Sequence, residues 1–136
     1  MTYGIAVWGS CSASFNDIER IHIRAARLIH KVPKDICNGE VLNHVGWNTL
    51  KYMYTKRILT VTHSAYYNDS IDEINNLIDK ETMKYSFRNS SKIKLNRPRT
   101  KIGRRTFKHR ATLAWNIIPD NIKMIRDASI FKRDLK

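Results

Sequence analysis

Residues 84–110 most strongly limit how this chain can fold, because they include eleven Lys or Arg and no Asp or Glu. Burying unpaired charges is costly, so this stretch must form surface. Residues 1–81 hold nine basic and nine acidic side chains, whereas residues 82–136 hold 16 basic and three acidic ones. The second part therefore supplies the whole formal net charge of +13. We expect a neutral region over 1–81 and a basic region over 82–136 that faces a polyanion, which would offset its self-repulsion.

Length and composition predict a soluble chain with a modest core. The chain has 136 residues, of which 42% are hydrophobic. Its longest apolar run, Ile5 to Trp8, is too short to cross a bilayer, and no basic segment precedes it as in a secretory signal. Cys11 and Cys37 form no spaced disulfide framework. We expect an intracellular protein with no membrane partner; the sequence does not distinguish nucleus from cytoplasm.

Helical periodicity dominates the first part. A helix is expected from about Phe15 to Lys31, ended by Pro33, and a second from Asn48 or Thr49 to about Tyr67. Shorter helices are expected at 39–44, capped by Asn38, and at 71–78, 111–118 and after Ser129. The apolar positions that define the two long helices are Ile18, Ile21, Ala25, Leu28 and Val32 in the first, and Leu50, Tyr54, Ile58, Val61 and Ala65 in the second.

Extended structure is expected in two places. Residues 1–9 are β-branched and aromatic enough for a short strand or the end of a buried element. Residues 85–88 and 106–110 are predicted as strands that flank a polar, basic loop at 89–105. The predicted fold class is thus mainly α, a helical bundle with a small extended or β section near residues 85–110.

The sequence lacks the common catalytic and metal-binding motifs. It has no phosphate-binding GxxxxGK[ST] loop, no C-x-x-C and no HExxH, and the spacing of His30, Cys37 and His44 is not a recurrent zinc pattern. Two-metal nucleotidyl transfer needs converging carboxylates, and no Tyr-x-Asp-Asp turn is present. We therefore expect no catalytic residues, metal or cofactor in this chain, and no enzyme activity from the chain alone.

The basic residues themselves are the candidate binding site. Lys and Arg neutralise phosphates, and the interleaved aromatic residues Tyr85, Phe87 and Phe107 can stack on unpaired bases. The alternatives are a solvated charged loop and a nuclear-import signal within Arg97 to Arg110. The candidate nucleic-acid-binding residues are Arg88, Lys92, Lys94, Arg97, Arg99, Lys101, Arg104, Arg105, Lys108 and Arg110, with a second surface of Arg20, Arg24, Arg27 and Lys31, which fall within about 60° on one helix face.

Several short motifs occur in an order that resembles a known family. They are Tyr3-Gly4-Ile5-Ala6-Val7-Trp8-Gly9, Arg24-Ala25-Ala26-Arg27-Leu28-Ile29, Trp47-Asn48-Thr49-Leu50, Arg99-Thr100, Gly103-Arg104-Arg105-Thr106-Phe107, Ala114-Trp115-Asn116-Ile117-Ile118-Pro119 and Phe131-Lys132-Arg133-Asp134-Leu135-Lys136. The chain resembles the region that follows the polymerase palm in non-LTR (LINE-type) retrotransposon reverse transcriptases, over essentially its whole length.

The resemblance implies a thumb-like helical region over 1–81 and a basic C-terminal region that hold template RNA or the primer–template duplex. It also implies that the fingers and palm, with the catalytic aspartates and the Mg²⁺ that such a polymerase uses, lie upstream of Met1. Partners would be RNA or DNA and that upstream region, and Met1 would be an internal methionine of a truncated copy or gene-model fragment. The alternative is a structural or interaction fragment with no independent activity and no independent fold.

Overall fold

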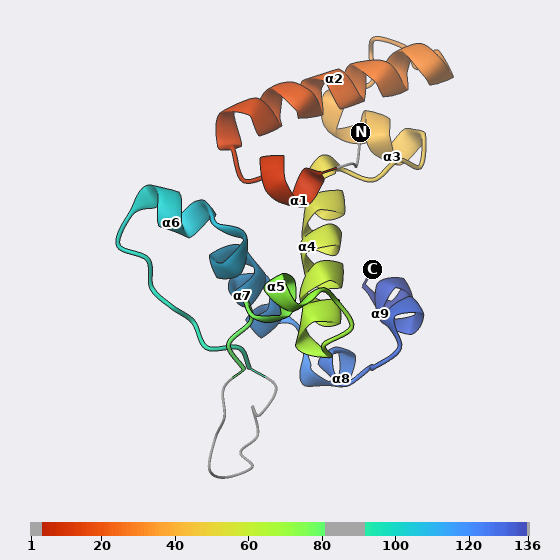
Figure 1. Ribbon diagram of the computed structural model, residues 1–136. Helices are drawn as coiled ribbons and strands as arrows, with labels where there is room; N and C mark the ends of the chain where they lie inside the picture. The colour runs from red at the N-terminus through yellow and green to blue at the C-terminus, as the bar shows by residue number, and fades with distance from the viewer. Residues whose placement is uncertain (1–3, 81–91, 136) are drawn as a thin grey trace. The chain divides into compact units, whose positions relative to one another are not determined.

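The computed structural model describes residues 4–80 and 92–135, which form nine helices and no strand (Figure 1). The expected mainly α fold is confirmed. The chain divides into two compact units, Met1–Tyr54 and Thr55–Lys136. The change in charge near residue 81 therefore falls inside the second unit. Within the described ranges, no helix is long and apolar enough to span a bilayer.

The first unit holds α1 (Ile5–Trp8), α2 (Ser12–His30), α3 (Asn38–His44) and the start of α4 (Leu50–Tyr66). The prediction of a strand near residues 1–9 is wrong for residues 5–8. The Gly9 N–H closes a helical turn by donating to the Ile5 carbonyl at 2.9 Å. Ile5 is buried, and a Cβ on Gly9 would lie 2.4 Å from the Tyr54 ring. Close packing on Gly9 therefore overrides the β-branched composition.

The expected long helix is confirmed as α2, which begins three residues before the predicted start. It ends where Lys31 takes a left-handed conformation, with φ of 50°. Pro33 follows two residues later, as expected for a helix stop.

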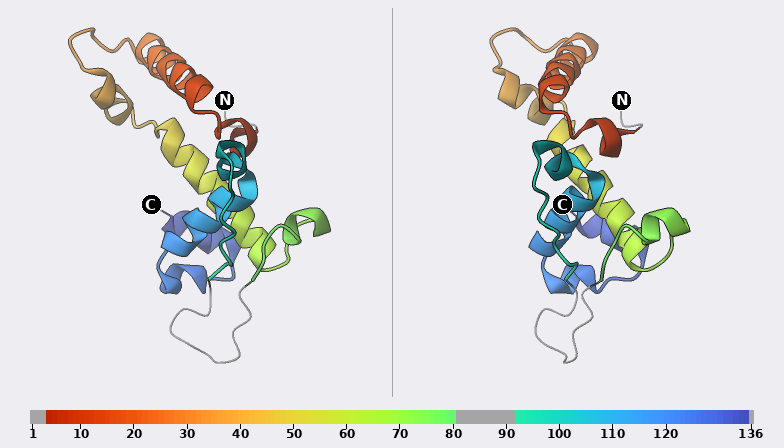
Figure 2. Two further views of the ribbon diagram at one scale, coloured as in Figure 1. Left: turned by 90° about the vertical axis from the view of Figure 1, so that its left-hand side faces the viewer. Right: turned by 60° about the vertical axis from the view of Figure 1, so that its left-hand side comes forward.

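The face that α2 buries differs from the predicted one. Helices α2 and α3 lie side by side (Figure 2), and their core is formed by Ala26, Val32, Val41 and Leu42. Of the predicted apolar positions only Val32 is buried, whereas Ile21 and Leu28 are exposed. The helix turns its Ala26 side to α3 because a small residue lets two helices approach closely. Asn38 does not cap α3 either: Cys37 holds that position.

The second unit is built around the later part of α4. It contains α5 (Asp72–Asn75), α6 (Lys101–Arg105), α7 (Phe107–Ile117), α8 (Asp120–Lys123) and α9 (Ala128–Asp134). Figures 1 and 2 show α7, α8 and α9 gathered around α4. His63 of α4 stacks on Phe131 with ring centroids 4.2 Å apart, and its Nε2 lies 2.7 Å from the Ile125 carbonyl oxygen. Trp115, fully buried, packs against the same histidine.

The predicted apolar stripe of α4 is confirmed, since Leu50, Tyr54, Ile58 and Ala65 are buried. Thr49, one of the two residues expected at its start, caps it: the Thr49 hydroxyl oxygen accepts from the Tyr52 N–H at 3.2 Å.

Helix replaces one of the two strands in the predicted extended section. Residues 107–110, expected as strand, begin α7, and the expected loop contains α6. The reason is that residues 107, 111 and 115 repeat at helical spacing and place Ala111 and Trp115 in the core. The other predicted strand, 85–88, lies outside the described residues. Extended pairing among the described ones is limited to a single bridge between Lys80 and Ile93.

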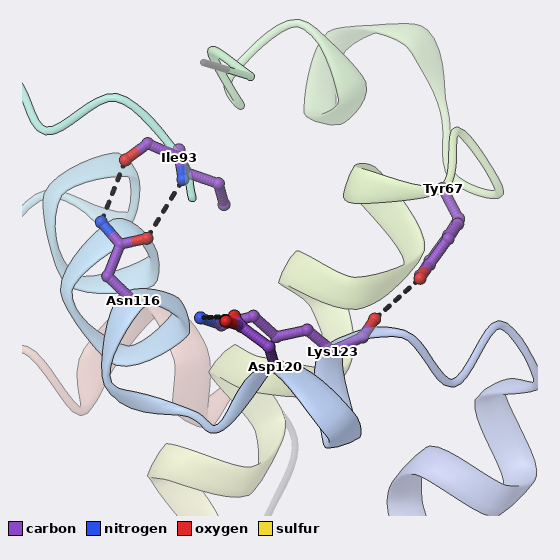
Figure 3. A network of polar contacts seen from close by, with 5 residues as sticks. All are labelled: Tyr67, Ile93, Asn116, Asp120 and Lys123. Carbon is purple, nitrogen blue, oxygen red and sulfur yellow. Dashed lines mark hydrogen bonds and ion pairs between the residues drawn. The ribbon is translucent and has the colours of Figure 1, made fainter. Parts of the chain in front are cut away.

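The C-terminal helices also depart from expectation at their starts. The expected helix at 111–118 does end before Pro119, as α7. Asp127, rather than Ser129, caps α9, because its carboxylate accepts from the Ser129 N–H at 2.7 Å and the Ile130 N–H at 3.0 Å. Helix α8 was not predicted; its Lys123 is buried and pairs with Asp120 at 3.1 Å. The Tyr67 hydroxyl donates to the Lys123 carbonyl and ties α8 to the end of α4 (Figure 3).

Candidate nucleic-acid interface

The described part of the candidate site is a loop that precedes α6 and continues into α7 (Figure 1). It leaves the core at Ile93, whose side chain is buried. We call residues 92–105 the basic loop, since they include seven Lys or Arg and no Asp or Glu. Its sequence explains the exposure, because charged residues alternate with short polar or apolar ones and give no continuous apolar face.

Two hydrogen bonds fasten the start of the basic loop to α7. Asn116 accepts from the Ile93 N–H at 3.1 Å and donates from its side-chain amide to the Ile93 carbonyl at 3.0 Å (Figure 3). The Ile93 side chain is buried, and the Lys94 N–H donates to the Asp79 carbonyl at 2.9 Å. The loop therefore starts from a fixed point in the core.

The far end of the basic loop is stiffened by α6. The Thr100 hydroxyl oxygen accepts from the Gly103 N–H at 3.0 Å, and the Thr106 hydroxyl donates to the Gly103 carbonyl at 2.7 Å. A Cβ on Gly103 would lie 2.7 Å from the Pro98 Cβ, so only glycine lets α6 fold against Pro98. Thr106 is extended, with ψ of 148°, and separates α6 from α7.

Six of the seven cations of the basic loop are exposed to solvent. Within residues 4–80 and 92–135, none of the loop's basic side chains lies within ion-pair distance of a carboxylate. Lys92 is half-buried, and the exposed members are Lys94, Arg97, Arg99, Lys101, Arg104 and Arg105. Their positive charge is therefore not neutralised by the described part of the protein.

Other predicted residues lie in different surroundings. Lys108, on α7, forms an ion pair with Asp79 at 2.8 Å and is half-buried. Arg110 is half-buried on the same helix. Of the aromatic residues proposed for stacking, Phe107 is half-buried, whereas Tyr85 and Phe87 lie outside the described residues, as does Arg88.

The second predicted surface belongs to α2 in the first unit. Arg24 and Lys31 are exposed there, and Arg20 lies 3.8 Å from Asp17. Arg27 differs: its guanidinium donates to the Pro33 carbonyl at 2.7 Å and also to the Ile36 carbonyl and the Asn38 side chain. Arg27 therefore holds the connection between α2 and α3.

Sequence reasoning missed the residues that position the basic loop. Asn116 lies within a helical stretch, and nothing local marks it as the partner of a peptide 23 residues earlier. The Thr100 cap could have been found, because threonine is a favoured N-cap residue whose hydroxyl oxygen accepts from the N–H two or three residues further on.

The chain matches no protein-family model, and comparisons with curated proteins and with solved structures give no significant match. In the parts of the chain that the structure describes, no three His, Cys, Asp or Glu side chains gather as metal ligands.

Proposed function

We propose that the chain binds nucleic acid through phosphate contacts made by the basic loop. We further propose that it is the C-terminal, thumb-like part of a non-LTR retrotransposon reverse transcriptase, an RNA-directed DNA polymerase, where it would hold template RNA or the primer–template duplex. The ordered motifs support the second proposal. The polymerase's catalytic aspartates and Mg²⁺ site would lie in its upstream fingers and palm, so the chain alone would bind without catalysis.

One observation carries the binding proposal. Six exposed cations project from residues 94–105, a segment tied to the core at Ile93 and stiffened by α6. A loop fixed at both ends presents its charges with a smaller loss of conformational entropy on binding than a free tail would. Exposed cations without carboxylate neighbours are the groups that release counterions from a phosphate backbone.

Salt dependence tests the proposal. Anisotropy of a labelled 20-nucleotide RNA and of the matching RNA–DNA duplex would be measured with the full chain from low to physiological salt. We expect log Kd to depend linearly on log salt, with a slope of about 0.7 to 0.9 per phosphate contacted.

A charge-matched pair of variants separates the basic loop from net charge. Replacing Arg97, Arg99, Arg104 and Arg105 with Gln should weaken binding and lower the slope by about 3 if all four contact phosphates. The control variant replaces four basic residues with Gln as well. They are exposed elsewhere in the second unit: Arg57, Arg126, Lys132 and Arg133. Equal losses in the two variants, or an affinity independent of salt, would refute a role for the loop.

The alternative is a structural fragment with no activity of its own. Exposed apolar side chains on α2, such as Leu28 and Ile29, favour this alternative. A helix with an uncovered apolar face is expected to need a partner. A thermal melt of the isolated chain discriminates: a cooperative transition indicates an independent fold, and a featureless slope indicates a fragment.

A further inference from the structure

Helix α2 carries an apolar face that its own unit leaves uncovered. Ile21, Leu28 and Ile29 are 54%, 76% and 65% exposed. Ala25 lies among them and is half-buried. At 100° per residue these four positions fall within about 100° of the helix circumference, so they form one continuous ridge. Single exposed apolar residues are ordinary, but a ridge of this kind marks an interaction surface.

A groove runs along each side of this ridge. One, of about 540 Å³, lies between the Ala25–Ile29 side of α2 and Trp47 and Met53. The other, of about 520 Å³, is lined by Ile21 and by the arginines Arg20 and Arg24. Trp47 does not project from its groove, because it packs against His22 and His30 at centroid distances of 5.3 and 5.6 Å.

The charge beside the ridge is mainly positive. Arg20, Arg24 and Lys31 are exposed along the adjoining sector of α2, and Asp17 is the acidic side chain among the residues lining the second groove. A partner that covered the ridge would have to bring acidic groups to these cations, since burying them unpaired is unfavourable.

We infer that this face of α2 docks an amphipathic helix with an acidic flank, contributed by a partner protein. The ridge would fit between the partner's side chains while the partner's apolar residues enter the two grooves, as in ridges-into-grooves packing. The partner's Asp or Glu side chains would pair with Arg24, since Arg20 already lies 3.8 Å from Asp17. This inference concerns the first unit and does not depend on the proposed role of the basic loop.

Two other partners fit the face less well. An anionic membrane surface suits a convex apolar face with projecting aromatic side chains, whereas this ridge stands between two grooves and its tryptophan is recessed. Nucleic acid would pair with the arginines but would leave Leu28 and Ile29 facing a phosphate backbone. A helical partner satisfies the apolar and the charged parts together.

Three synthetic 18-residue helical peptides test the inference against the full chain. The first peptide has Leu at positions i, i+4, i+7 and i+11, flanked by Glu. The second keeps these leucines but has Lys in place of the flanking Glu. The third keeps the flanking Glu but has Ser in place of each Leu. Anisotropy of labelled peptide gives the affinity. We expect saturable binding of the first peptide only.

Protein variants then locate the site. Leu28→Ser and Arg24→Glu should each weaken binding by about tenfold or more, since each removes a buried apolar or charged contact. Ile117→Ser, 82% exposed on α7, and Arg133→Glu, exposed on α9, are the matched controls. Circular dichroism checks that every variant keeps its helix content, which the exposure of these side chains predicts.

Four results would overturn the inference: no binding of the Glu-flanked peptide, equal binding of the Lys-flanked peptide, equal binding by Leu28→Ser, or equal losses in the controls. Vesicles of phosphatidylserine and phosphatidylcholine, and the 20-nucleotide RNA, are tested in parallel. If Leu28→Ser weakened binding to the vesicles or to the RNA but not to the peptide, the helical partner would also be refuted.

Discussion

Asn116 should be a main determinant of how firmly the basic loop is held. Its side chain makes both hydrogen bonds to the Ile93 peptide, at 3.1 and 3.0 Å, and the Ile93 side chain is buried beneath them. Replacing Asn116 with Ala removes both partners at once and leaves an N–H and a C=O of a buried residue unpaired.

The magnitude follows from the number of bonds lost. A hydrogen bond contributes about 1 kcal/mol net, and a buried polar group left unpaired costs about 1 to 3 kcal/mol. Because Asn116 is half-buried, water can reach part of the site, and we expect a loss of about 2 kcal/mol of unfolding free energy. For a unit of this size that corresponds to a fall in Tm of roughly 8 to 16 °C.

Urea denaturation, a thermal melt and hydrogen exchange at the Ile93 amide would measure the effect. Asn121→Ala, at an exposed position on α8, is the matched control and should change stability by less than about 0.5 kcal/mol. If Asn116→Ala and Asn121→Ala had the same Tm, or if the Ile93 amide kept its protection in the first variant, the anchoring role would be refuted.

Two further predictions concern one side chain in each unit. Arg27→Lys keeps the charge but loses the guanidinium donors to the Pro33 and Ile36 carbonyls, so it should lower the urea midpoint of unfolding. Arg24→Lys, at an exposed position, should leave the midpoint unchanged, and equal effects of the two substitutions would contradict the prediction. Hydrogen bonds from the backbone N–H groups of Ile130 and Ser129 lower the pKa of Asp127 in the folded chain below its ordinary value of 3.8. The ionised carboxylate therefore contributes its full stabilisation above pH 3.8, and this contribution is lost as the pH falls through the lowered pKa. The Tm difference between wild type and Asp127→Ala should therefore narrow below pH 3.8, and a constant difference from pH 2 to 7 would show that ionisation of Asp127 does not matter.

Local sequence was sufficient wherever one helix face or one terminus decides the structure. The stripe from Leu50 to Ala65 specified the buried side of α4, and the prolines 33 and 119 marked the ends of α2 and α7. The structural role of a glycine and the choice of N-cap residue were harder to predict. Asp127 and Ser129 are both good N-cap residues, and only the chain path shows that Asp127 accepts the two N–H bonds.

The basic loop illustrates the same division for the candidate site. Its charge and exposure follow from the sequence, since seven cations without an acid cannot be buried. The sequence could not show that Lys108 is paired with Asp79, 29 residues away, or that the loop is fastened through Asn116. Those contacts join positions far apart in the chain, and no local pattern records them.

For this protein the sequence by itself determined that the fold is mainly helical and that the charge of the basic loop lies on the surface, because helical periodicity and the cost of burying charge act locally. Tertiary structure decided which face of α2 is buried. Composition favours the side with Ile21 and Leu28, but α3 packs against Ala26 and is held there by Arg27, so the more apolar side stays exposed. Packing geometry between helices, rather than hydrophobicity along one helix, sets that outcome.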